Sequence, residues 1–209
     1  MPNSFSISPG EVHIWRVDLG LWSGVLAELS AEERARAARF RWEDVRRRWA
    51  AGRAALRLIL ERYTGTPAAE LLFARGEYGK PYLAGSPVRF NMTDSGDLAL
   101  YAVALDAEIG VDIERVRPID GVGISRRFLP APEAAAVRDD PASFFRIWTR
   151  REAYLKCIGV GLRRIDAPIE PGYSIADLEP AAGYAGAAVW QGAGRRLVVR
   201  DFQTDQATR

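Results

Sequence analysis

The clearest alternation of apolar and polar residues lies at Ile109–Glu114 and predicts a strand. Because successive side chains of a strand point to opposite faces, its three apolar side chains would share one face, and Gly110, Asp112 and Glu114 the other. The two carboxylates would then stand roughly 7 Å apart along the strand, an arrangement that favours a cation between them. Gly110 would leave room for a ligand at the backbone. The pattern alone fits a strand with a solvated acidic face equally well.

A second pattern, between Asp140 and Gly159, predicts one helix. Asp140 suits the N-cap, Pro141 the first helical position, and Gly159 the stop. Glu152 and Lys156 are four residues apart, so they share one face of this helix. By itself such a pair is usually a surface ion pair that contributes about 0.2–0.5 kcal/mol.

The remaining pattern predicts an α+β protein. Helices are expected from Ser30, which opens a Ser-x-x-Glu capping box, to about Phe40, and over Glu43–Tyr63. Strands are expected at Glu11–Leu19, within residues 71–90, at Leu98–Leu105 (buried on both faces), and at 172–175, 187–190 and 196–202. Residues 118–123 are expected to form a loop, followed by short helical pieces to Asp139, and residues 204–209 a frayed end. Each half of the chain thus has a long helix and several strands.

Composition excludes several classes of protein. The net charge is +2, so no overall polycation argues for nucleic acid, although residues 31–64 hold ten arginines and five acids. The single cysteine, Cys157, permits no intramolecular disulfide, and the single histidine, His13, lies far from the carboxylates in sequence. Both are expected to be structural, which argues against Cys-His catalysis and zinc. No leader or membrane span is apparent, so a soluble cytoplasmic protein is expected.

Four motifs in order resemble the 4′-phosphopantetheinyl transferases, in the longer, single-chain, Sfp-like branch. They are Tyr78-Gly-Lys-Pro81, Phe90-Asn-Met-Thr-Asp-Ser95, Gly110-Val-Asp-Ile-Glu114 and Trp148-Thr-Arg-Arg-Glu-Ala-Tyr-Leu-Lys156-Cys-Ile-Gly159. The resemblance extends from about Ser30 to about Ser174, nearly the whole chain. It implies two similar α+β halves related by a pseudo-twofold axis, divided here as residues 1–105 and 106–209, with the site in the cleft between them.

The resemblance also implies the activity, which is transfer of the 4′-phosphopantetheine arm of coenzyme A to a carrier-protein serine with release of adenosine 3′,5′-bisphosphate. Asp112, Glu114 and Glu152 would be the ligands of Mg²⁺, a cation that prefers carboxylates, waters and phosphate oxygens. Lys156, one turn beyond Glu152, would reach the same phosphates. Glu152, or a water held by the metal, would be the base for the serine hydroxyl.

Further residues would bind the coenzyme by resemblance, namely Lys80, Arg48, Arg36, Thr93 and Asp94. The chain contains only two lysines, Lys80 and Lys156, and both lie in the motifs. Asp94 departs from the family, which usually has histidine there. Asp94 could turn away as a turn cap, could face the site and weaken coenzyme binding, or could mark a catalytically degenerate module that only binds coenzyme A or a carrier.

The partners implied by the resemblance are acidic acyl or peptidyl carrier domains of fatty acid, polyketide or nonribosomal peptide biosynthesis. A basic and apolar surface that includes Arg126, Arg127, Phe128 and Leu129 would suit such a partner. No nucleic acid or membrane partner is expected. The single-chain branch implies a monomer.

Overall fold

The computed structural model describes residues 6–21 and 26–202, and the end expected to be frayed, residues 204–209, lies outside them. Its helices are α1 (Ala31–Ala37), α2 (Glu43–Thr64), α3 (Gly121–Phe128), α4 (Ala131–Ala136) and α5 (Pro141–Ile158). Its strands are β1 (Glu11–Asp18), β2 (Phe73–Arg75), β3 (Pro81–Leu83), β4 (Val88–Ser95), β5 (Leu98–Leu105), β6 (Ile109–Arg115), β7 (Tyr173–Leu178), β8 (Tyr184–Gln191) and β9 (Arg196–Asp201). The α+β class predicted from the sequence is confirmed.

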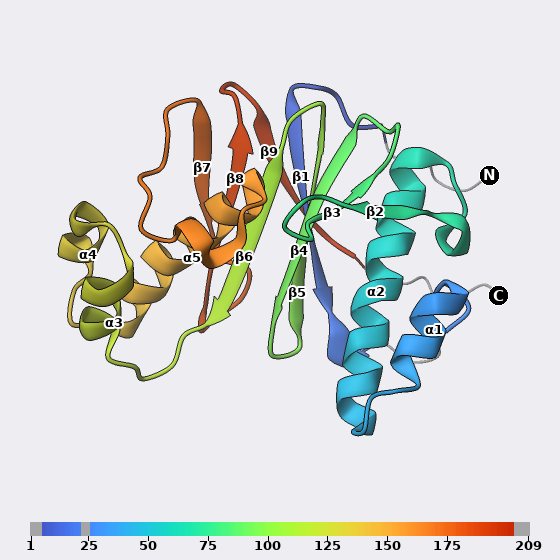
Figure 1. The fold of residues 1–209 in the computed structure, drawn as a ribbon, viewed down its shortest axis with the longest axis horizontal. Helices are drawn as coiled ribbons and strands as arrows, with labels where there is room; N and C mark the ends of the chain where they lie inside the picture. The colour runs from blue at the N-terminus through green and yellow to red at the C-terminus, as the bar shows by residue number, and fades with distance from the viewer. Residues whose placement is uncertain (1–5, 22–25, 203–209) are drawn as a thin grey trace.

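Two sheets lie between the two long helices, α2 and α5 (Figure 1). One has the strand order β4-β5-β1-β9 and the other β6-β8-β7, while β2 and β3 form a separate hairpin. The order β1, α2, β4–β5 is repeated as β6, α5, β7–β8, and β5 pairs antiparallel with β1 as β8 does with β6. The expected pair of similar halves is therefore present.

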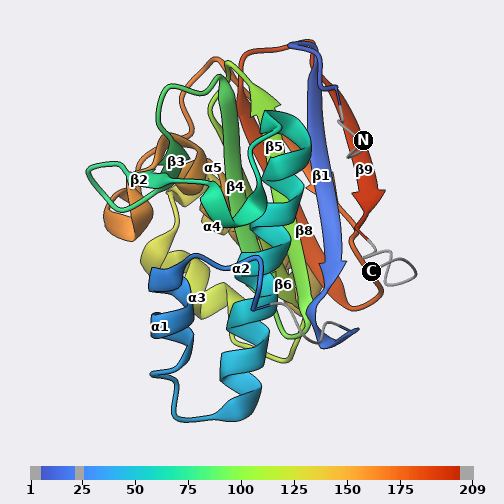
Figure 2. The same cartoon turned by 90° about the vertical axis from the view of Figure 1, so that its right-hand side faces the viewer.

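Strand β9, the last strand that the structure describes, joins the sheet of the first half. β9 comes from the second half of the chain but pairs parallel with β1 in the first sheet (Figure 2). The division of the chain at residues 105 and 106 stays a prediction.

Strand β5 is buried on both faces, as its apolar sequence predicts. Tyr101 and Val103 pack into a core beneath α2, and Leu100 and Ala102 pack into a second core between the two sheets. Each sheet thus has one face against a helix and one against the other sheet, which brings the edge strands β4 and β6 together.

Helix α5 begins and ends where the sequence predicts. The Asp140 side chain accepts hydrogen bonds from the backbone N–H groups of Ala142 and Ser143, and Gly159 ends the helix in the left-handed region, with φ 73°. The helix lies so close to β6 that a Cβ added at Gly110 would stand 2.0 Å from the carbonyl oxygen of Ala153. The expectation that Gly110 leaves room for a ligand is wrong, because the backbone of α5 fills that space.

The expected short helices after residue 123 are present as α3 and α4, but α3 begins earlier than predicted, within the loop expected at residues 118–123. It begins at Gly121 because Asp120 caps it, with Asp120 Oδ1 accepting a hydrogen bond from the Gly123 N–H at 2.8 Å. A side chain at Gly121 would collide with Phe144 of α5, so the glycine permits the two helices to pack. The glycines of this segment are typical of turns, but a local cap and the packing of Gly121 on α5 place them in the first turn of the helix.

Candidate active site

The two halves meet along a row of polar side chains on β4, which we call the polar ladder: Asn91, Thr93 and Ser95. Asn91 Oδ1 accepts a hydrogen bond from the Val111 N–H at 3.0 Å, and Ser95 Oγ accepts one from the Arg115 N–H at 3.1 Å. These residues alternate along the strand, so all three point to the same side, toward β6. Side chains thus supply the hydrogen bonds that a backbone ladder would supply within one sheet.

The polar ladder holds the two acidic side chains of β6. Thr93 Oγ1 donates a hydrogen bond to Asp112 Oδ1 at 3.1 Å, and Ser95 Oγ donates one to Glu114 Oε2 at 3.3 Å. Lys156 Nζ reaches across from α5 to Asp112 Oδ1 at 2.5 Å and to Thr93 Oγ1 at 3.1 Å. Residues from three elements therefore meet around one carboxylate.

Asp112 is only 4% exposed, and its surroundings determine its protonation. Burial raises the pKa of the Asp112 carboxyl above its ordinary value, while the Lys156 ammonium and the Thr93 hydroxyl oppose that rise. Its second oxygen, Oδ2, is buried and has no hydrogen-bond partner. A buried carboxylate oxygen without a donor lowers the stability of the fold, and a bound cation would satisfy this atom.

Glu152 lies one turn before Lys156 on α5 and is half-buried. Burial raises the pKa of Glu152, and the negative charges of Asp112 and Glu114 add to that rise. Its side chain forms no hydrogen bond or ion pair with another residue in the described part of the chain. The charges of Asp112 and Glu114 thus act on Glu152 through space.

The donor set suits a hard divalent cation, although the side chains are not arranged around one. Within residues 6–21 and 26–202, no group of three or more His, Cys, Asp or Glu side chains is placed so that it could hold a metal ion. Lys156 instead occupies Asp112 Oδ1, and Arg117 Nη1 lies 3.3 Å from Glu114 Oε2. The unpartnered oxygen of Asp112 and the free carboxylate of Glu152 are the chemistry that Mg²⁺ prefers.

A cavity of about 830 Å³ lies between α1, α2, the β2–β3 hairpin and β4, on the side of β4 opposite to this cluster. Arg36 and Arg48 both line it, as does Asp94. The Arg36 guanidinium lies 5.2 Å from the ring centre of Trp49, and Arg48 pairs with Asp97 at 3.2 Å. The structure therefore brings these three predicted residues together in one basic cavity.

Asp94 is part of strand β4 rather than of the turn after it. It is exposed, and its side chain forms no hydrogen bond or ion pair with any residue the structure describes. It alternates with Thr93 and so points to the opposite side of the strand, into the basic cavity. Of the three alternatives, the turn cap is excluded, since no capping hydrogen bond is present.

Lys80 lies apart from both groups. Its ammonium contacts Glu108, the Ile109 carbonyl at the start of β6 and the Cys157 carbonyl in the last turn of α5, and it lines a second cavity, of about 760 Å³. Arg53 was not predicted from the sequence. It lines the basic cavity, and its Nη2 lies 2.7 Å from Glu33 Oε1. Asn91, Thr93 and Ser95 are polar residues at every second position of β4, and this spacing is the sequence signal that predicts a polar row on one face of the strand.

His13 and Cys157, the two residues expected to be structural, are both buried. His13 is 1% exposed, and its Nδ1 lies 2.8 Å from the hydroxyl of Tyr63. Burial raises the pKa of the Cys157 thiol to about 12, which leaves it unreactive near neutral pH.

Two related halves, an acidic cluster with one lysine, and an arginine-lined cavity on the other side of β4 are features that suit an enzyme acting on a phosphate-bearing substrate. Two family models match the chain: that of the N-terminal domain of 4′-phosphopantetheinyl transferases over residues 13–106, and that of the 4′-phosphopantetheinyl transferase superfamily over residues 108–185.

Curated relatives agree with these matches. The chain is 37% identical over 190 residues to the 4′-phosphopantetheinyl transferase HetI of Nostoc sp., covering 81% of this chain and 80% of that one. It is 36% identical over 140 residues to psf-1 of Bacillus pumilus, covering 64% and 59% of the two chains, and 31% identical over 144 residues to a Bacillus subtilis 4′-phosphopantetheinyl transferase, covering 66% and 63%. The chain belongs to the 4′-phosphopantetheinyl transferase family, whose members use coenzyme A as substrate and act on carrier proteins.

Proposed function

We propose that this chain transfers 4′-phosphopantetheine from coenzyme A to a serine of an acyl or peptidyl carrier protein, with Asp112, Glu114 and Glu152 holding Mg²⁺. The observation that supports it most is the convergence of these carboxylates with Lys156 on one side of β4, while the basic cavity lies on the other side of the same strand. When bound, the metal would offset the negative charge on the coenzyme pyrophosphate.

The side chains then have distinct tasks. The serine oxygen attacks the phosphorus that bears the pantetheine arm, the bond from that phosphorus to the bridging oxygen breaks, and adenosine 3′,5′-bisphosphate leaves. Glu152, whose carboxylate has no other partner among the described residues, accepts the serine proton. Lys156 uses two of its three N–H donors on Asp112 and Thr93, which leaves one for a phosphate oxygen.

The arginines of the basic cavity would hold the remaining phosphates of the coenzyme. Arg36 and Arg48 lie within reach of a common ligand, because both line this cavity. Thr93 is buried and hydrogen-bonded to Asp112, so in this proposal it orients the carboxylate. Asp94 points into the same cavity, where Arg53 is an additional cation. A monomeric state and a cytoplasmic location stay predictions; no helix in the described residues is long and apolar enough to cross a membrane.

The first test of the proposed function is the intact mass of purified apo carrier proteins after incubation with the chain, coenzyme A and Mg²⁺. We expect a gain equal to one phosphopantetheine arm, lost when a chelator is added and restored by excess Mg²⁺. Carriers from fatty acid, polyketide and peptide pathways would be compared side by side. Coenzyme A binding without a mass gain on any carrier would overturn the proposal and favour the binding module.

Carrier docking is proposed to use the end of α3. Arg126, Arg127 and Phe128 are exposed there, with Phe128 42% exposed, whereas Leu129 is 7% exposed and belongs to the interior. Including Leu129 in the docking surface was therefore wrong. A basic surface with one exposed aromatic ring suits an acidic helical partner.

Replacing Arg126 and Arg127 by Glu is expected to raise the KM for an acidic carrier by about tenfold while leaving the KM for coenzyme A unchanged. Reversed charges repel the approaching partner but lie outside the coenzyme cavity. Steady-state kinetics at several salt concentrations would measure this. Arg126→Glu and Arg127→Glu would also be made singly, and Arg196→Glu on β9, which changes the net charge as much as either single variant, would be the control. An unchanged carrier KM would remove α3 from the docking surface.

A further inference from the structure

All three N–H donors of the Lys80 ammonium are engaged within the protein. Lys80 Nζ donates to Glu108 Oε2 at 2.6 Å, to the Cys157 carbonyl at 2.8 Å and to the Ile109 carbonyl at 3.1 Å. The side chain is only 17% exposed. Because an ammonium has three N–H groups, no donor of Lys80 is left for a coenzyme phosphate in this arrangement.

The two carbonyls belong to the elements that carry the acidic cluster. Ile109 begins β6, three residues before Asp112, and Cys157 follows Lys156 in the last turn of α5. The last carbonyls of a helix lack intrahelical partners, and a cation there complements the helix dipole. Lys80, which comes from the β2–β3 hairpin of the other half, therefore caps the end of α5 and joins it to the beginning of β6.

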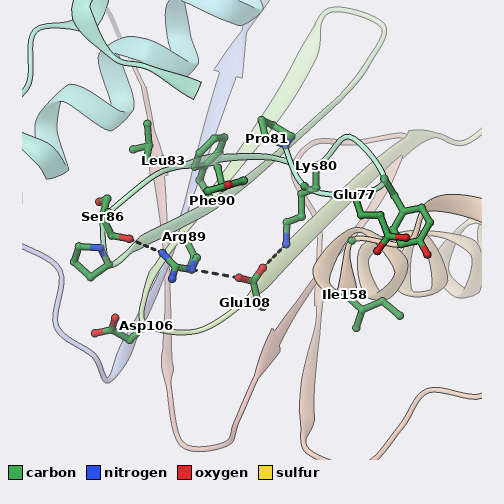
Figure 3. A pocket seen from close by; sticks show the side chains of 16 residues that line it. Glu77, Lys80, Pro81, Leu83, Ser86, Arg89, Phe90, Asp106, Glu108 and Ile158 are labelled. Atoms are coloured by element: carbon green, nitrogen blue, oxygen red, sulfur yellow. Dashed lines mark hydrogen bonds and ion pairs between the residues drawn. The ribbon is translucent and has the colours of Figure 1, made fainter. Parts of the chain in front are cut away.

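The surroundings of Lys80 fix its position. Glu108 also pairs with Arg89 at 3.2 Å, so a chain of charges runs from β4 through the β5–β6 turn to the end of α5 (Figure 3). Gly159 lies against the aliphatic part of Lys80, where an added Cβ would stand 3.4 Å from Lys80 Cδ. The ammonium is thus held by a carboxylate and two backbone carbonyls rather than by solvent.

We propose that Lys80 is a positioning residue: it locks the C-terminal end of α5 onto β6 and so keeps Glu152 and Lys156 in register with Asp112, instead of binding coenzyme phosphates. This inference rests on the proposed function of the same site. A planar guanidinium cannot replace a compact ammonium among three acceptors at 2.6–3.1 Å, whereas it would serve well as a phosphate ligand.

The arginine substitution separates the two roles. For Lys80→Arg and Lys80→Met we expect kcat to fall by about 10- to 100-fold, because α5 loses its register with β6. The Kd for adenosine 3′,5′-bisphosphate, measured by calorimetry without Mg²⁺, should change by less than about twofold. If Lys80 instead binds phosphate, Lys80→Arg keeps its kcat and Lys80→Met weakens nucleotide binding by about tenfold, and that pattern overturns the proposal. Arg48→Gln, in the basic cavity, serves as the comparison for loss of a phosphate contact.

A measurement independent of turnover keeps the inference testable if the chain loads no carrier. Amide hydrogen exchange of residues 156–160 should be faster in Lys80→Met than in the wild-type chain, because the end of α5 loses its cap. Glu108→Gln should accelerate the same amides, and the double variant should add little to either single one. Unchanged exchange in all three variants would overturn the positioning role, whether or not the transferase activity is found.

Discussion

Gly110→Ala is expected to lower the free energy of unfolding by about 3 kcal/mol or more and to abolish transfer. The added methyl carbon would lie 2.0 Å from the Ala153 carbonyl oxygen and 2.4 Å from the Cys157 backbone nitrogen. Both contacts are to the backbone of α5, which cannot rotate away as a side chain could. The helix must separate from β6, and Glu152 and Lys156 move with it.

Urea unfolding followed by circular dichroism would measure this loss. Gly52→Ala is a matched control, because Gly52 lies inside α2 and an added Cβ there meets its nearest neighbour, the Tyr101 hydroxyl, at 3.6 Å. That substitution is expected to increase stability by up to about 1 kcal/mol through the higher helix propensity of alanine. Equal unfolding midpoints for Gly110→Ala and the wild-type chain would contradict the close packing of α5 on β6.

The sequence predicted the elements that carry the site because their signals are local. Asp140 and Gly159 mark the ends of α5 through the capping preferences of single residues, and the alternation at Ile109–Glu114 assigns faces to β6. The apolar sequence of β5 likewise predicts a strand covered on both sides. Each of these inferences needs only neighbouring residues, so no tertiary contact had to be known.

The contacts between the halves could not be predicted in this way. Lys80 meets the Cys157 carbonyl across 77 positions of sequence, and Thr93 meets Asp112 across 19. A motif indicates that such residues share a site, but it does not distinguish a ligand-binding lysine from one that caps a helix. Gly110 shows the same ambiguity, since the absence of a side chain accommodates a ligand or a helix equally well.

The acidic cluster was predicted in part from physical pattern and in part by resemblance. Strand alternation placed Asp112 and Glu114 on one face, but only the resemblance joined Glu152 to them. The structure brings Glu152 close enough for the charges of Asp112 and Glu114 to raise its pKa. Like charges are held together here at a cost to stability, as is typical of functional sites.

Glu152→Gln is therefore expected to affect activity and stability in opposite directions. The amide has nearly the shape of the carboxylate, but it neither accepts a proton nor binds Mg²⁺ strongly, so kcat should fall by about 1,000-fold or more. Removing one of three mutually repelling charges should leave the free energy of unfolding unchanged or raise it by up to about 1 kcal/mol. Carrier mass spectrometry over time and urea unfolding would measure the two effects.

Glu179→Gln makes the same chemical change at an exposed position outside the cluster and should leave both quantities unchanged. The combination distinguishes a catalytic carboxylate from a structural one. If Glu152 served only to stabilise α5, its replacement would reduce stability, and activity would fall only as far as the folded fraction does. A Glu152→Gln chain that is less stable than the wild type yet keeps more than about a tenth of its kcat would exclude Glu152 both as metal ligand and as base.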